Sequence, residues 1–203
     1  MTNVITYIDG FNLYHGIRSK YGRKYIWLDI QQLSEELMTP EETLIEVNYF
    51  TAMIGNAPQK EFRQKTYISA LETLTKVNIH YGKYQVNLHT CPKCNFVEKI
   101  PSEKMTDVNI ATRLLTDAFN NHYDTAKLIT ADSDLVGPIR TIRQLFPHKK
   151  IIVCFPPDRV SFELKNIASA YFHIPRTKLA RSQFSNQIML KNGTLITKPT
   201  SWV

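Results

Sequence analysis

The sequence predicts an α/β fold in which helices cover both faces of a mostly parallel sheet of about five to six strands. Short apolar, β-branched runs of strand length alternate with longer segments whose apolar residues recur at helical spacing. This alternation is typical of parallel sheets, because two parallel neighbours need a crossover connection, usually a helix. The runs expected as strands are 4–8, 46–54, 77–88, 127–130, 151–155 and 171–174.

Helical segments are expected between these strands. The most regular one runs from Asp107 to Phe119, and Thr106 before it is the expected N-cap. A Gly-Pro pair at Gly137 and Pro138 opens another helix after the fourth strand. Further helices are expected over 29–38, 58–76 and 161–168.

Length and hydrophobic content limit the number of domains. The chain has 203 residues, of which 43% are hydrophobic, which allows one well-buried core and is short for two. We therefore expect one domain over 1–175, interrupted by an insertion at 89–100, and a C-terminal extension over 176–203. No apolar run approaches the about 18 residues that cross a membrane, and the N-terminus lacks the pattern of a secretory signal.

The cysteine content indicates the cellular compartment, and the net charge indicates the kind of partner. Three cysteines, of which two form one CxxC, do not make a disulfide framework and fit a reducing compartment, so we expect a cytoplasmic protein without a membrane partner. The formal net charge of +7 favours an anionic partner, nucleic acid before membrane. The sequence is also compatible with a homodimer.

Aspartates stand where the expected strands end and where one helix begins. Asp9 follows the first strand, Asp132 and Asp134 follow the fourth, and Asp107 opens the helix between the third and fourth strands. In a parallel sheet, crossover helices begin at the edge where the strands have their carboxyl ends. The four carboxylates can therefore meet in one crevice, with Asn12 nearby.

Each of these aspartates also has an ordinary structural interpretation. Asp9 and Gly10 could form a turn, Asp132 could cap a helix, and Asp134 or Asp107 could complement a helix dipole. Asp107, however, lies on the helix face that carries Ala111, Leu114 and Ala118, where an unpaired carboxylate is costly. Asp117, in the last turn, is expected at a less buried angle and receives no role.

Clustered carboxylates at this edge indicate a cation site. Asp9, Asp107, Asp132 and Asp134 offer the oxygen ligands that Mg²⁺ or Mn²⁺ takes. Such a cation can activate a water and offset the charge that develops on a phosphodiester. Hydrolysis of nucleic acid is the chemistry that this predicts, and the absence of a Gly-rich phosphate loop argues against a nucleotide-binding enzyme.

Basic residues are interleaved with aromatic residues in the loop from Arg18 to Trp27. The loop could hold phosphates on its cations and stack bases on its rings, or it could be a solvated loop whose Trp27 turns into the core. Three more cations at 60–65 are expected on a solvated face of a helix rather than in a binding site. The candidate nucleic-acid contacts are Arg18, Arg23, Lys24 and Lys104.

The insertion contains Cys91 and Cys94 in a Cys-Pro-x-Cys turn, which supplies half of a tetrahedral zinc site. A complete structural Zn²⁺ site would have to recruit His80, His89 or a second subunit, because the chain has no second CxxC. The alternative is a plain loop with a free dithiol. Cys154 lies in a strand pattern and is expected in the core.

Three motifs in this order resemble those of NYN-domain proteins, the bacterial branch of the PIN-like nucleases. They are Tyr7–Tyr14, Glu103–Val108 and Thr130–Leu135, and the resemblance extends to about Pro175. The end of the chain, 191–202, is similar to the small strand pair and Pro-x-Ser-Trp ending of several such proteins. The resemblance implies a PIN-like three-layer α/β/α fold and ribonuclease activity. It also implies Mg²⁺ or Mn²⁺ held by Asp9, Asp107, Asp132 and Asp134.

From these observations we expect a metal-dependent ribonuclease that acts on single-stranded or structured RNA. The expected catalytic residues are Asp9, Asn12, Asp107, Asp132 and Asp134, with Asn12 orienting the first aspartate or the substrate phosphate. One alternative is an RNA-binding module whose acidic site does not catalyse. Another is a structure-specific DNA nuclease or a phosphatase.

Overall fold

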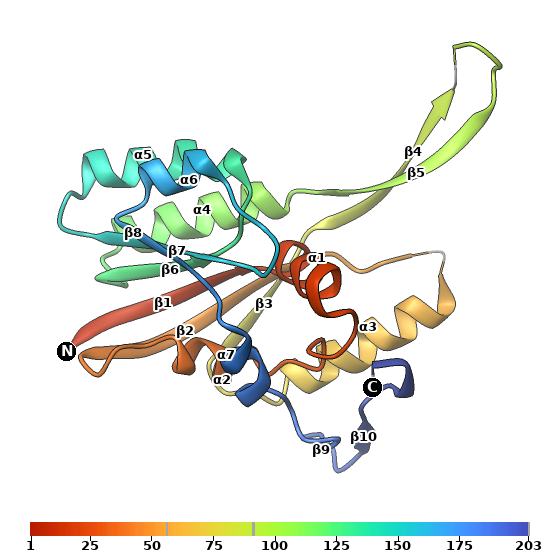
Figure 1. Cartoon of the computed structure of the whole chain (residues 1–203), viewed down its shortest axis with the longest axis horizontal. Coiled ribbons are helices and arrows are strands. Elements are labelled where there is room, and N and C mark those ends of the chain that lie inside the picture. The colour runs from red at the N-terminus through yellow and green to blue at the C-terminus, as the bar shows by residue number, and fades with distance from the viewer. Residues whose placement is uncertain (56, 91, 203) are drawn as a thin grey trace.

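The computed structural model describes residues 1–55, 57–90 and 92–202, and the side chains in these ranges apart from those at 84–89 and 98–103. Its centre is a six-stranded sheet in the order β3-β2-β1-β6-β7-β8, in which every neighbouring pair is parallel (Figure 1). The strands are β1 (Thr2–Asp9), β2 (Glu42–Thr51), β3 (Val77–Tyr81), β6 (Thr125–Ile129), β7 (Lys150–Phe155) and β8 (Ala170–His173).

Helices cover both faces of this sheet, which confirms the predicted three-layer α/β/α architecture (Figure 1). One face carries α1 (Gly10–Tyr21), α2 (Ile30–Glu36), α3 (Pro58–Leu71) and α7 (Arg176–Arg181). The other face carries α4 (Thr106–Phe119), α5 (Val136–Leu145) and α6 (Phe162–Ile167).

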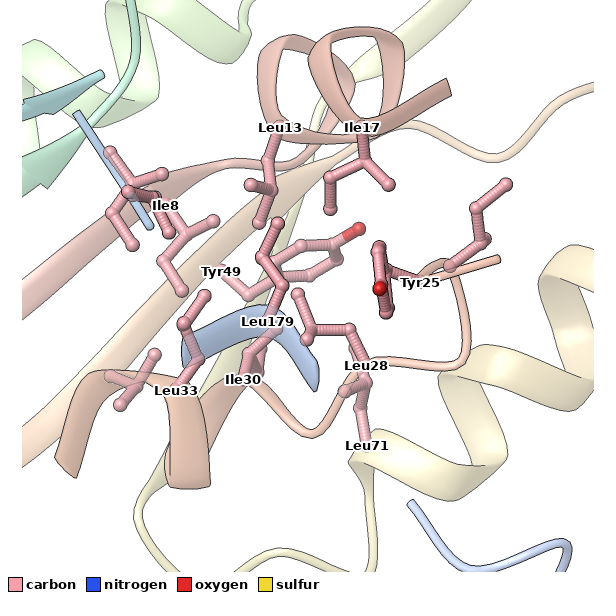
Figure 2. Close-up of a cluster of buried hydrophobic side chains, with 14 of the residues drawn as sticks. Ile8, Leu13, Ile17, Tyr25, Leu28, Ile30, Leu33, Tyr49, Leu71 and Leu179 are labelled. Atoms are coloured by element: carbon pink, nitrogen blue, oxygen red, sulfur yellow. The ribbon is translucent and has the colours of Figure 1, made fainter. Parts of the chain in front are cut away.

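Alternation along the strands divides the core into two clusters, one on each face. In β1, Tyr7 packs in the cluster between the sheet and α4, whereas its neighbour Ile8 packs in the cluster on the opposite face, between the sheet and α1. Figure 2 shows this second cluster, where Leu13 and Ile17 of α1 point toward Tyr49 of β2. The helices are thus held by apolar side chains at i and i+4, as their sequence spacing predicts.

The sheet reverses its winding direction between β1 and β6. From β1 the chain adds β2 and then β3 on one side of β1. It then returns to the other side of β1, where β6 pairs with β1 and Ile8 lies opposite Ile129, and adds β7 and β8 beyond β6. Ligands of open α/β sheets bind in the crevice at the carboxyl ends of the strands at such a switch point. Asp9 and Thr130 lie at this position.

A long antiparallel hairpin, β4 (Lys83–Thr90) and β5 (Val97–Lys104), extends away from the sheet (Figure 1). The sequence predicted one strand over 77–88 and an insertion at 89–100. In the structure, the chain leaves the sheet at Gly82, and the hairpin covers a longer part of the sequence than the predicted insertion. A Cβ at Gly82 would lie 2.8 Å from both the Lys104 carbonyl oxygen and Thr106 Oγ1. Glycine therefore allows the two ends of the hairpin to approach closely.

The C-terminal segment packs on the same core as the domain. It contains α7 and the predicted strand pair, β9 (Gln187–Met189) with β10 (Leu195–Thr197), followed by a 3₁₀ turn, η2 (Thr200–Trp202). The Trp202 ring is 6.0 Å from both the Trp27 ring and the Tyr67 ring, centroid to centroid. Each helix in the described ranges is too short or too polar to span a membrane.

Candidate active site

Asp9 ends β1 at the switch point, and its side chain is held there from two sides. Its Oδ1 accepts a hydrogen bond from the Asn12 backbone N–H at 2.9 Å, so that Asp9 caps α1. Its Oδ2 accepts one from Thr130 Oγ1 at 3.0 Å. The residue is only 5% exposed, and burial raises the pKa of Asp9, with a further contribution from the charge of Asp132.

Asn12 and Thr130 join the start of α1 to the segment that follows β6. Asn12 Oδ1 accepts a hydrogen bond from the Ala131 backbone N–H at 3.2 Å. Thr130 Oγ1 accepts one from the Asp132 backbone N–H at 3.1 Å while its own hydroxyl donates to Asp9. These contacts fix the backbone of Asp132 relative to the Asp9 carboxylate.

Asp132 caps a helix, which is the structural role that its sequence position also suggested. Its Oδ1 accepts a hydrogen bond from the Asp134 backbone N–H at 3.0 Å and so caps the short 3₁₀ helix η1 (Ser133–Leu135). Capping uses one carboxylate oxygen. The side chain also lines a cavity, whereas Asp134 is exposed and is not among the residues that line it.

Asp107 lies in the first turn of α4, as predicted, but its side chain is half-buried and faces the same cavity rather than the core. The pKa of Asp107 is raised to about 6, mainly by burial and in addition by the charges of Asp132, Asp9 and Asp134, in that order. The predicted N-cap is wrong: Met105, in a left-handed conformation with φ of 79°, occupies that position, and Thr106 is the first residue of the helix.

These side chains surround a cavity of about 150 Å³, which we call the acidic cavity. Three of the four predicted metal ligands line it, and no ion pair of Asp9, Asp107 or Asp132 is found in the described part of the chain. The full lining is Asp9, Phe11, Asn12, His15, Thr106, Asp107, Asp132 and Arg159.

The oxygen atoms that line the acidic cavity are of the chemical type that hard cations bind. Besides the carboxylates, Thr106 Oγ1 lies on the wall, buried and without a hydrogen-bond partner among the described residues. Carboxylate and hydroxyl oxygens are ligands of Mg²⁺ and Mn²⁺. Among the described residues, no three His, Cys, Asp or Glu side chains are close enough to form a ready metal-ligand set.

Sequence reasoning missed five residues of this site: Phe11, His15, Thr106 and Arg159, which line the cavity, and Thr130, which donates a hydrogen bond to Asp9. His15 follows Asn12 by three residues on α1, a helical spacing that could have indicated it. Burial lowers the pKa of His15, and the cations Arg159 and Arg18 lower it further. Arg159 comes from the turn after β7, and no sequence pattern indicated that its side chain lies at the acidic cavity.

The predicted nucleic-acid contacts divide between two locations. Arg18 and Arg23 line a second cavity of about 130 Å³ between α1, β2 and α3, which we call the aromatic cavity. Lys24 and Lys104 are exposed and line neither cavity. The aromatic residues on its walls are Phe11, Tyr14, Tyr49, Tyr67 and Trp202.

A doubly wound parallel sheet with carboxylates at its switch point agrees with the nuclease-like fold of the PIN-like proteins, to which NYN domains belong. The model of the NYN domain matches residues 3–177. The chain therefore belongs to the NYN domain family.

Two comparisons with individual proteins accompany this assignment. The chain is 26% identical over 235 residues to 6-hydroxy-3-succinoylpyridine 3-monooxygenase HspA of Pseudomonas putida, with 97% of this chain and 74% of that protein covered. A crystal structure of a protein of unknown function from Vibrio parahaemolyticus is similar with a TM-score of 0.56 and 16% identity. The alignment covers 86% of this chain and 94% of that one, and it supports the fold alone.

Proposed function

We propose that this protein is a metal-dependent ribonuclease that hydrolyses phosphodiester bonds in the acidic cavity. The observation that carries the proposal is that Asp9, Asp107 and Asp132 line one cavity at the switch point without forming an ion pair in the described part of the chain. Carboxylates brought together without cations raise each other's pKa, as Asp107 shows. Membership of the NYN family supports a nucleic acid as the substrate.

Asp9, Asp107 and Asp132 would hold Mg²⁺ or Mn²⁺, with Asp134 adding negative charge from the next turn. The cation, when bound, lowers the pKa of a water and offsets charge on the phosphate. Asn12 and Thr130 keep the carboxylates in place through the hydrogen bonds described above.

The cationic and titratable residues on the wall have roles in the same reaction. Arg159 lines the acidic cavity and can bind a non-bridging phosphate oxygen, since its guanidinium forms no ion pair with the described residues. The lowered pKa of His15 keeps its imidazole uncharged at neutral pH, so that it can accept a proton. The net charge of +7 favours binding of the RNA backbone.

A second candidate comes from the relative in Pseudomonas putida, whose name describes oxygenation of a substituted pyridine. The observation in its favour is the aromatic cavity, which could admit a small aromatic acid. The carboxylates of the acidic cavity have no evident part in that reaction. Hydrolysis of RNA, which uses them, is therefore our first candidate.

The test is incubation of the pure protein with an end-labelled RNA pool, with Mn²⁺ and with EDTA, beside a DNA pool of the same sequences. We expect RNA products with Mn²⁺ and none with EDTA. Binding of RNA in EDTA without any product in Mn²⁺ would show a binding module instead. Equal cleavage of the DNA pool would contradict the preference for RNA.

A further inference from the structure

The aromatic cavity adjoins the acidic cavity through the first turn of α1. Gly10, which follows Asp9 directly, lines the aromatic cavity, and Phe11 lines both cavities. A Cβ at Gly10 would lie 2.7 Å from the Tyr49 hydroxyl and from the Phe50 carbonyl oxygen, so only glycine allows α1 to approach β2 this closely. A ligand in the aromatic cavity would thus lie against the same turn of α1 that borders the carboxylates.

The walls of the aromatic cavity are formed by aromatic rings that are held in place. The Tyr67 hydroxyl donates a hydrogen bond to the Leu28 carbonyl oxygen at 2.7 Å, and the ring of Trp202, only 6% exposed, packs against it. Tyr49 lies among Leu13, Ile17 and Leu28 in the apolar cluster (Figure 2). Rings fixed in this way offer a preformed surface for a planar ligand.

Four cations line the same cavity: Arg18, Arg23, Lys60 and Arg63. No aspartate or glutamate is among the lining residues, and none of the four cations forms an ion pair within the described ranges. Arg18 donates to the Tyr14 hydroxyl at 3.2 Å and Arg23 to the Ser201 carbonyl oxygen at 3.2 Å, and neither acceptor carries a charge. This concentration of positive charge favours an anionic ligand.

We propose that the aromatic cavity holds one unpaired nucleotide of the strand that is cut in the acidic cavity, with its base against the aromatic rings and its flanking phosphates on the four cations. This inference rests on the proposed function and names its substrate as single-stranded RNA. A strand supplies a phosphate on each side of the base, which matches four cations better than the one carboxylate of a small aromatic acid. A base can enter only when it is unpaired, and any base offers a ring face for stacking.

The contribution of the base is measured by fluorescence anisotropy in EDTA, where no cleavage occurs. The ligands are a labelled eight-residue single-stranded RNA and a sugar–phosphate strand of the same length without bases. We expect the intact RNA to bind at least about fivefold more tightly, because stacking of one base on aromatic side chains contributes about 1–3 kcal/mol. Equal affinity for the two strands would overturn the proposal.

Two pairs of variants locate the effect in the aromatic cavity. Arg63→Gln should weaken binding of the intact RNA at least about threefold, whereas Lys65→Gln, an exposed lysine of α3 outside the cavity, should leave it nearly unchanged. Ile54→Trp fills the cavity from its lining and should remove most of the advantage of the intact RNA, unlike Ile45→Trp on the exposed side of β2. Melting curves of each variant show whether it is folded.

The outcomes separate this inference from the proposed hydrolysis. Tighter binding of the intact RNA that depends on Arg63, with no product in Mn²⁺, supports the nucleotide site and contradicts hydrolysis. Saturable binding of 6-hydroxy-3-succinoylpyridine that depends on Arg63, together with equal affinity for the two strands, would assign the cavity to small aromatic acids and overturn the proposal. Equal losses in Arg63→Gln and Lys65→Gln would also overturn it.

Discussion

Asp117 and the aspartates of the acidic cavity differ in what satisfies their charge. Asp117 was expected at a less buried angle, but it is 1% exposed. Its carboxylate accepts hydrogen bonds from the Tyr7 hydroxyl at 2.7 Å and from Arg113 Nε at 2.8 Å, and lies 3.1 Å from His122 Nδ1. Burial is tolerated there because the charge is paired, whereas Asp107 and Asp132 lack such a cation among the described residues.

The raised pKa of Asp107 predicts how the stability of the metal-free protein depends on pH. The group keeps its proton up to about 6 in the folded protein but only to about 3.8 in the unfolded chain, so the folded state binds more protons between these values. The free energy of unfolding in EDTA should therefore fall as the pH rises from about 4 to about 6. Asp9, whose pKa is also raised, adds to the same trend.

Urea denaturation at several pH values between about 4 and 7 in EDTA tests this for the wild type and Asp107→Asn. The variant should lose less stability over this range, because its side chain cannot ionise. The dependence of the free energy of unfolding on pH that remains in the variant should be the part due to other groups, Asp9 among them. Identical slopes for the two proteins would contradict the assignment of Asp107 to a crowded acidic cavity.

The residues that sequence reasoning found and missed differ in the elements that carry them. Asp9, Asp107 and Asp132 were predictable because each lies at the end of a strand or the start of a helix. Arg159 was not, since its place on the wall depends on how the turn after β7 packs against α1. Gly16 of α1 marks this contact, because a Cβ there would lie 2.6 Å from the Pro157 carbonyl oxygen.

At the scale of elements, the hairpin β4–β5 is where the prediction from sequence differed most from the structure. Apolar residues stand at 77, 79 and 81 and then at 84, 86 and 88, so the alternation changes phase at Gly82, but this local signal does not show that the chain leaves the sheet there. The break depends instead on the approach of Gly82 to Thr106, which lies more than twenty residues away in the chain. The six strands of the sheet and the helices α2 to α6 were predictable because their periodicities are local. The sequence did not predict α1, part of which was expected as a loop, or α7, which lies in the C-terminal extension.

We propose that the turn of this hairpin binds structural zinc. Cys91 and the side chain of His89 lie outside the described part of the structure, and Cys94 is exposed. Protein purified under reducing conditions should then carry about one equivalent of zinc. Cys94→Ser should lower this content, and Cys154→Ala, which changes a buried core cysteine, should not. Less than about a tenth of an equivalent by elemental analysis would exclude the site.

At the scale of the whole molecule, strand order determines which residues become neighbours. Alternation of strands and helices predicted a parallel sheet, but it contains no information that β1 lies between β2 and β6. That order places Asp9 beside Thr130 and the acidic cavity at the switch point. The aromatic cavity depends on residues that are even further apart in the sequence, because Trp202 lines it together with residues of α1.

The central claim is that the aspartates form a cation site rather than a set of caps, and Asp132→Asn tests it most directly. Asparagine keeps the oxygen that accepts the hydrogen bond from the Asp134 backbone, so the cap of η1 is retained while one negative charge is removed. Asp117→Asn is the matched control, because it removes a buried charge that pairs with Arg113 outside the acidic cavity.

The measurement is a pair of melting curves, in EDTA and in Mn²⁺, for the wild type and both variants, beside the RNA cleavage assay. Asp132→Asn should melt as high as the wild type or higher in EDTA, gain nothing from Mn²⁺ and cleave at least about a hundredfold more slowly. Asp117→Asn should melt lower in EDTA and keep both the gain from Mn²⁺ and cleavage. If Asp132→Asn instead melts lower in EDTA, is still stabilised by Mn²⁺ and still cuts RNA, the cation site is contradicted.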